Sequence, residues 1–310
     1  FTLQDINSVF LAGLNVGDVF ASQRATGRTE ARATLESNSN LIIGGLGLSV
    51  ASLQAGDLSQ AIGDGKLWIN NSQNGIAIGS LLSVGVVDAA DNGHAAADGK
   101  FVIDTVNNGG VTFAGPALIG VVNASDFSNY NTHAFAKIAN IDGQVTFADQ
   151  FLSDANKALQ IGTVRGTGAS SGEAWGMLRI DTLNGVLRIG GPVEVGLADL
   201  LSSASTVATG KLIVEDIIDT GVDPFALEIL TGHLRVGRIV ANQFSQGEAH
   251  GLMKVHNTET GGFVLGFVEA GVSLTTGQAS GEATGELSFS KLGGTLQFGN
   301  TPVPDGTLLL

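Results

Sequence analysis

Few residues in the 310-residue chain have types and spacings that could support chemistry. Arg188 and Glu228 occupy equivalent places in two successive copies of a sequence repeat, and a basic residue beside a carboxylate can abstract a proton from a sugar. A surface ion pair worth under about 1 kcal/mol accounts for the same two residues more simply. We therefore predict no catalytic residues and a protein that is not an enzyme.

The sequence also lacks the spacings that hold metals and cofactors. His250 and His256 are six residues apart, which places both on one face of a strand but does not match a zinc-binding helix. Phosphate-binding glycine motifs, the nucleophile elbow and calcium-binding repeats are all missing. We predict no metal site, no cofactor-binding residue and no cofactor.

Charge and composition limit which partners the protein could bind and where it could be located. The net charge of −14, with scattered Lys and Arg, argues against nucleic acid as a partner. The longest uncharged apolar stretch, residues 41–56, is shorter than the roughly 20 residues of a membrane-spanning helix, so we expect no membrane insertion. The chain starts at Phe1 without Met, and we expect a secreted protein whose signal peptide has been removed, located outside the cell or on its surface.

A repeated phrase organises the chain. It consists of an apolar residue, Gly, any residue and a second apolar residue, and its glycines are Gly17, Gly85, Gly120, Gly196, Gly237 and Gly271. Ala51 replaces the glycine midway between the first two, which gives a unit of about 34 residues. Later units reach about 41 residues, and we place one degenerate copy near Ser153.

Two further phrases in each unit predict two more short strands, as in Gly65–Ile69 and Gly75–Gly79. Turns rich in Asn, Asp, Gly and Ser separate them. Residues 149–159 and 198–207 are the best candidates for short helices.

A unit with three short strands cannot bury an apolar face alone, so neighbouring units must stack. We predict an all-β, β-helix-like solenoid of about eight to nine units of 34–41 residues, with glycines at its corners; a β-propeller or a β-sandwich is the alternative. The chain would be a single repeat domain over 1–310, with a partial unit at 1–24, stacked repeats at 25–300 and an end strand at 301–310.

Neither end of this array resembles a polar cap, which solenoids normally use against edge-to-edge association. We predict that the terminal strands form an assembly interface, whose residues are Phe1, Leu3, Val9, Phe10, Leu11, Leu308, Leu309 and Leu310. The alternative is that both apolar ends fold over the stack as small caps.

The resulting hypothesis is a non-enzymatic extracellular structural protein that polymerises with itself, head to tail, into a filament, fibre or sheath by β-strand augmentation. The alternative is a cell-surface adhesin or phage-fibre-type module that binds glycans or the cell envelope through loops at Gln160–Gly176 and Asp216–Phe225.

Overall fold

The structure is a computed structural model of the whole chain. It describes residues 1–6, 9–21, 26–37, 39–45, 47–56, 60–70, 72–89, 94–125, 129–147, 159–169, 171–202, 205–218, 225–229, 233–242, 246–264, 267–277, 280–293, 296–298 and 307–309. All statements below concern these residues.

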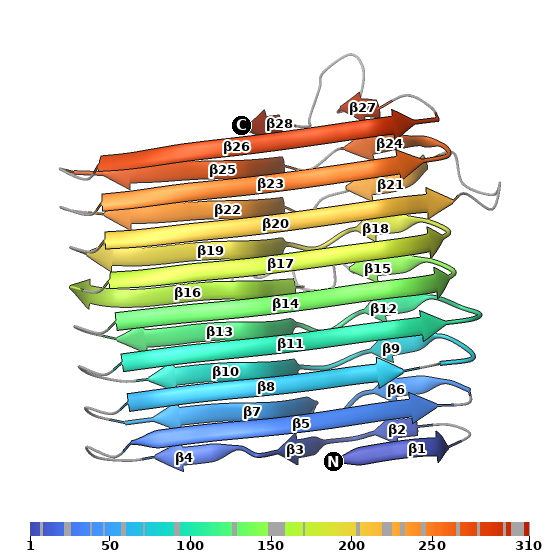
Figure 1. Cartoon of the computed structure of the whole chain (residues 1–310), viewed down its shortest axis with the longest axis horizontal. Helices are drawn as coiled ribbons and strands as arrows, with labels where there is room; N and C mark the ends of the chain where they lie inside the picture. Colours follow the sequence, from blue (N-terminus) through green and yellow to red (C-terminus); the bar gives the residue numbers. More distant parts are fainter. Residues whose placement is uncertain are drawn as a thin grey trace.

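Three sheets run along the whole stack (Figure 1). Sheet A holds nine strands, β1 (Thr2–Ile6), β5 (Gly27–Ser37), β8 (Gln60–Asn70), β11 (His94–Val106), β14 (Asn129–Asp142), β17 (Ser171–Asn184), β20 (Ser205–Ile218), β23 (Gln246–Thr258) and β26 (Ser280–Leu292). Sheet B holds nine shorter strands, β2 (Val9–Leu11), β6 (Leu41–Ile43), β9 (Ile76–Ile78), β12 (Val111–Phe113), β15 (Val145–Phe147), β18 (Leu187–Ile189), β21 (Phe225–Ile229), β24 (Gly261–Val264) and β27 (Leu296–Phe298). Sheet C holds β3 (Leu14–Val16), β4 (Val19–Ala21), β7 (Leu48–Ala55), β10 (Leu82–Ala89), β13 (Ala117–Ser125), β16 (Leu159–Ala169), β19 (Val193–Ser202), β22 (His233–Asn242), β25 (Phe267–Thr276) and β28 (Thr307–Leu309).

Every described strand pairing is parallel, and each sheet takes one strand from each pass of the chain, except that the first pass gives both β3 and β4 to sheet C. Paired residues lie one sequence repeat apart, as Lys66 beside Lys100 and Val84 beside Val50 show. The all-β, solenoid-like architecture is therefore confirmed, and neither a propeller nor a sandwich describes these stacked parallel sheets. The helix expected at 198–207 is wrong, because β19 and β20 occupy these residues; 149–158 lies outside the described residues.

Sheet A differs from the expectation of short strands, since its strands after β1 are 11 to 14 residues long. Their side chains alternate between buried and partly exposed, as in β8, where Ala61, Leu67 and Ile69 are buried. Residues in the first half of these strands, such as Gly63 and Asp64, have low strand propensity. They are nevertheless part of the sheet because strands of the neighbouring coils form hydrogen bonds with their backbone groups. Sheet A thus forms one broad wall with an apolar inner face and a polar outer face.

The glycines of the repeated phrase lie in the middle of the sheet C strands and not at corners. Other glycines do occupy the predicted corners, since Gly110, Gly143 and Gly185 have positive φ at the turns between sheets A and B. Gly85 has φ of +61°, and a Cβ on it would lie 2.0 Å from the backbone oxygen of Asp98 in sheet A. Gly65 in sheet A approaches Gly85 from the other side, where an added Cβ would lie 2.3 Å from the Gly85 nitrogen. The two backbones therefore meet at a narrow waist that only the smallest residues allow.

The waist recurs in eight successive coils of the described residues. Residues with positive φ in sheet C form one row along the stack: Gly17, Ala51, Gly85, Gly120, Gly162, Gly196, Gly237 and Gly271. Their sheet A counterparts form a second row, also of small residues: Ala31, Gly65, Gly99, Ala134, Gly176, Gly210, Gly251 and Gly285. The copy expected near Ser153 is thus at Gly162, and the additional residues precede it.

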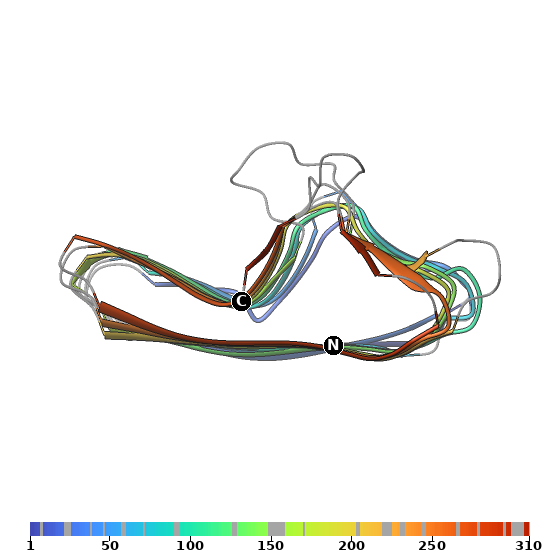
Figure 2. The same cartoon turned by 90° about the horizontal axis from the view of Figure 1, so that it is seen from above.

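The waist divides the interior into two cores (Figure 2). The larger core, bounded by all three sheets, contains Leu, Ile, Val and Phe columns such as the stacked rings of Phe113 and Phe147, whose centroids are 4.8 Å apart. The smaller core, between sheets A and C, is built mainly from Ala in sheet A and Val, Leu or Ile in sheet C, as with Ala95 and Val87. Because the positive-φ residue shifts the strand alternation, Val84 and Val87 both face inward, one into each core.

Candidate functional site

The predicted assembly residues lie on strands at the two edges of the stack. β1, β2 and the β3–β4 pair form one edge of sheets A, B and C, and β26, β27 and β28 form the opposite edge (Figure 1). The partial unit at 1–24 therefore contributes strands to all three sheets, and not only to sheet C as the repeat phrase indicated.

At the first edge, β1 covers only the second half of β5. Its pairing starts at Thr2 beside Thr34, the Phe1 oxygen accepts a hydrogen bond from the Thr34 nitrogen, and the Phe1 amino group donates to the Arg32 oxygen. The Phe1 side chain is 50% exposed, whereas Leu3 is partly buried against the larger core.

Strand β2 adds a short pairing with β6 to the same edge. Val9, Phe10 and Leu11 pair with Leu41, Ile42 and Ile43. Leu11 packs partly buried against the larger core, together with Leu14 and Val16 of β3, while the side chains of Val9 and Phe10 lie outside the described set.

At the opposite edge, Leu308 and Leu309 pair with Val268 and Glu269, so they form a strand of sheet C. Leu310 lies outside the described residues, as do the side chains of Leu308 and Leu309. In β26 of the same edge, Leu287 and Phe289 pack partly buried against the larger core. At both edges of the stack, the described residues therefore cover the larger apolar core only in part.

The paired residues form continuous apolar columns through the larger core. Following the pairing from coil to coil, the column that starts at Leu3 ends at Phe289, and the column of Leu14 ends at Leu308. In sheet B, the column of Leu11 ends at Phe298, whereas the column from Val9 to Leu296 is interrupted by Gly262 of β24. Each edge thus offers apolar positions in the same arrangement.

The other sequence candidates are one arginine–glutamate pair and two histidines. Arg188 and Glu228 lie in neighbouring strands β18 and β21 and form the expected ion pair. His250 Nε2 lies 3.9 Å from Glu248 Oε2, and His256 Nδ1 is buried without a hydrogen-bond partner. Within the described ranges, no group of three or more His, Cys, Asp or Glu side chains is arranged to hold a metal ion.

A chain of charged side chains lies on the outer side of sheet C, where sequence reasoning predicted none. Glu194 is fully buried and accepts hydrogen bonds from Arg165 and Arg235, each at 3.1 Å. Glu269 contacts Arg235 and Arg238, also at 3.1 Å. Burial lowers the pKa of Arg238, as does the charge of Arg235, while the carboxylates oppose this shift. Glu194, Arg235 and Glu269 each lie two residues before a waist glycine, and Glu194 is buried although strand alternation places it on the outer face.

Sequence reasoning also missed a mixed aromatic and basic area on the outer face of sheet A. The Arg32 guanidinium lies 4.2 Å from the ring centroid of Trp68, and the Lys100 nitrogen lies 5.5 Å from the same ring. His133 stacks on Trp175 with centroids 4.1 Å apart and an interplanar angle of 5°. Because these ring faces point along the stack and meet neighbouring side chains, they are poor platforms for a stacked sugar ring.

Carboxylates border this area on both sides. A surface hollow of about 610 Å³ is lined by Asp64, Lys66, Asp98, Gly99, Lys100, His133 and Phe135. Burial raises the pKa of Asp98, and Asp64 adds to this, while His133 and Lys66 oppose it. Burial would also raise the pKa of Asp181, but hydrogen bonds and charges of Lys137 and Arg179 lower it below its ordinary value.

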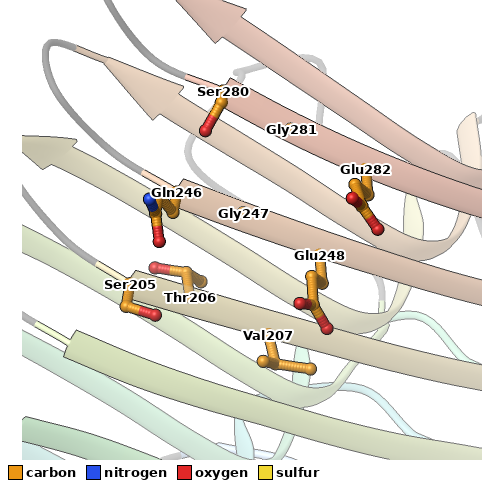
Figure 3. Close-up of a pocket in the computed structure, with 9 residues that line it drawn as sticks. All are labelled: Ser205, Thr206, Val207, Gln246, Gly247, Glu248, Ser280, Gly281 and Glu282. Atoms are coloured by element: carbon orange, nitrogen blue, oxygen red, sulfur yellow. The ribbon is translucent and has the colours of Figure 1, made fainter.

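A second hollow, of about 360 Å³, lies near the start of β20, β23 and β26 (Figure 3). Its side chains include Ser205, Gln246 and Ser280, and Glu248 and Glu282 lie on neighbouring strands beside them. Two carboxylates on adjacent strands make this end of sheet A acidic.

The loop predicted at Gln160–Gly176 is wrong, because these residues belong mainly to β16 and β17. Of the loop at 216–225, residues 219–224 lie outside the described residues. No helix long and apolar enough to span a membrane occurs among the described residues. Comparisons with protein families, curated proteins and solved structures give no significant match to the chain.

Proposed function

We propose that the chain is a non-enzymatic structural protein, outside the cell or on its surface, whose copies assemble head to tail into a filament, fibre or sheath. Eight to nine repeat units of about 34–41 residues would form the single stacked domain of each subunit. The observation that supports this proposal is the match between the edges: apolar columns of the larger core reach both, and apolar residues occupy both of their ends.

The strand directions support the same assembly. Because all pairings in the stack are parallel, the β1–β3 edge of one copy can add to the β26–β28 edge of another in the direction of the existing sheets. Continuing the columns places Leu3 of one copy next to Phe289 of another, and Leu14 next to Leu308. Such a contact joins two different surfaces, so it propagates instead of closing.

Assembly is favourable because it covers the apolar side chains and the backbone groups at these edges. Leu3, Leu11, Leu287 and Phe289 are only partly buried, and each apolar side chain that becomes fully buried gains up to about 1.5–3 kcal/mol. Backbone N–H and C=O groups at the sheet edges exchange water for partner strands at the same time.

The test is sedimentation velocity of the full chain and of two matched variants over a concentration series. We expect Phe1→Glu to lower the fraction assembled, because it places a carboxylate beside the apolar columns at the edge. Leu81→Glu is the control, since Leu81 is 43% exposed, against 50% for Phe1, and lies between the edges. Assembly that is equal for both variants, or a parent chain that sediments as a monomer at every concentration, would refute the proposal.

A further inference from the structure

A line of basic side chains crosses seven successive strands on the outer face of sheet A. From β5 to β23 these are Arg32, Lys66, Lys100, Lys137, Arg179, Lys211 and Lys254, hereafter the basic stripe. They account for seven of the 15 Lys and Arg residues in a chain whose net charge is −14. Because Lys and Arg are rare in this chain, the alignment of seven of them requires an explanation.

The strand pairing keeps the stripe straight. Lys66 pairs with Lys100, and Lys137 pairs with Arg179 in the position two residues further along the strand. All seven residues occupy one or the other of these two adjacent outward positions. With strands about 4.8 Å apart, the stripe is roughly 29 Å long and parallel to the stack axis.

Like charges in directly paired positions repel each other, so the stripe is not an arrangement that stabilises the isolated fold. Asp64 offsets the charge of Lys66, while Asp181 lies within 2.8 Å of Lys137 and also contacts Arg179. Among the ion pairs of the described residues, none includes Arg32, Lys100, Lys211 or Lys254. Four cations are thus available to an external anion.

We propose that the basic stripe binds a linear acidic polysaccharide that lies along the stack axis. Carboxylates of the sugar chain would contact the cations, with one or more carboxylates at each strand. The flanking carboxylates Asp64, Asp98 and Glu215 would accept hydrogen bonds from sugar hydroxyls, and the hollow beside Lys66 and Lys100 gives a sugar ring room.

The same flanking carboxylates argue against nucleic acid. The phosphate edge of a nucleic-acid backbone carries acceptors and no hydrogen-bond donors, so it would be repelled by these acidic borders. A sugar chain carries hydroxyl donors between its charges and satisfies both kinds of side chain. This binding would make the broad outer face of sheet A a second working surface, independent of the assembly edges.

The test uses polygalacturonate, a linear polyuronate, in affinity electrophoresis and calorimetry at low and high salt. The test variant combines Lys100→Gln, Lys211→Gln and Lys254→Gln, because removing these cations breaks no ion pair of the described residues. A single control, Lys291→Gln, removes an exposed cation outside the stripe.

We expect the parent chain to bind polygalacturonate with an affinity that falls with salt, and not to bind neutral dextran. The triple variant should lose about tenfold in affinity, while Lys291→Gln stays within about twofold. Equal affinity of the triple variant and the control would overturn the proposal, as would binding of single-stranded DNA as tight as binding of the polyuronate. Circular dichroism of every variant separates loss of binding from loss of fold, and sedimentation shows whether assembly is intact.

Discussion

Replacing Gly237 with Ala tests the waist between the two cores. Gly237 has φ of +63°, and a Cβ there would lie 1.9 Å from the His250 oxygen and 2.4 Å from the His250 carbonyl carbon. The left-handed conformation costs alanine about 1–2 kcal/mol. Overpacking against backbone that cannot rotate away adds about 1–3 kcal/mol. The lower conformational entropy of the unfolded alanine variant offsets only about 0.4–1 kcal/mol of this, so we expect a net destabilisation of about 1–5 kcal/mol.

The assay is denaturant unfolding followed by far-ultraviolet circular dichroism, with two controls. Gly44→Ala should leave the midpoint almost unchanged, because an added Cβ there meets no atom within 4 Å. Ala51→Gly should change stability by less than about 1 kcal/mol, because relief of the strained alanine at φ of +57° offsets the added freedom of the unfolded chain. If Gly237→Ala unfolds at the same midpoint as Gly44→Ala, the waist does not require glycine and the reasoning is wrong.

Three further predictions concern charged groups. Glu194→Gln should destabilise the chain by about 1–3 kcal/mol in thermal unfolding, because it removes a fully buried carboxylate that pairs with the partly exposed Arg165 and Arg235. Lys66→Met on the surface should change stability by under about 1 kcal/mol, and equal effects of the two substitutions would contradict the burial of Glu194. Folding stabilises the ionised form of Asp181, as its lowered pKa shows, so this contribution to stability is present above the ordinary value of 3.8 and is lost as pH falls through the lower folded pKa. The free energy of unfolding of Asp181→Asn should therefore depend less on pH than that of the parent in this acidic range. Asp98 has a raised pKa, so its contribution is present below 3.8 and is lost as pH rises through the folded value; Asp98→Asn should therefore be at least as stable as the parent at pH 7, and a clear loss there would contradict the assigned direction.

The stacked fold follows from sequence because the repeat marks most coils. The spacing from Gly17 to Gly85 identified Ala51 as the equivalent of the repeat glycines, and in the structure it shares their positive φ. The role of these glycines was not predictable in the same way. A positive-φ glycine suits a corner as well as a close contact between sheets, and only the three-dimensional path shows Gly65 facing Gly85.

The sites were less predictable because they depend on register across insertions. Lys137 and Arg179 are separated by one of the longer repeat units, and the pairing of β14 with β17 places them side by side. Glu194 was missed for another reason, since strand alternation predicts an outward position and the side chain is nevertheless buried, two residues before Gly196.

Head-to-tail assembly is tested most directly by electron microscopy of the full chain over a concentration series. The account predicts fibres of uniform width whose axial repeat is about 43 Å, the height of nine stacked strands. Their number should rise with concentration, and Phe1→Glu should reduce it while Leu81→Glu does not. Separate particles of one-subunit size at every concentration would contradict the proposed assembly.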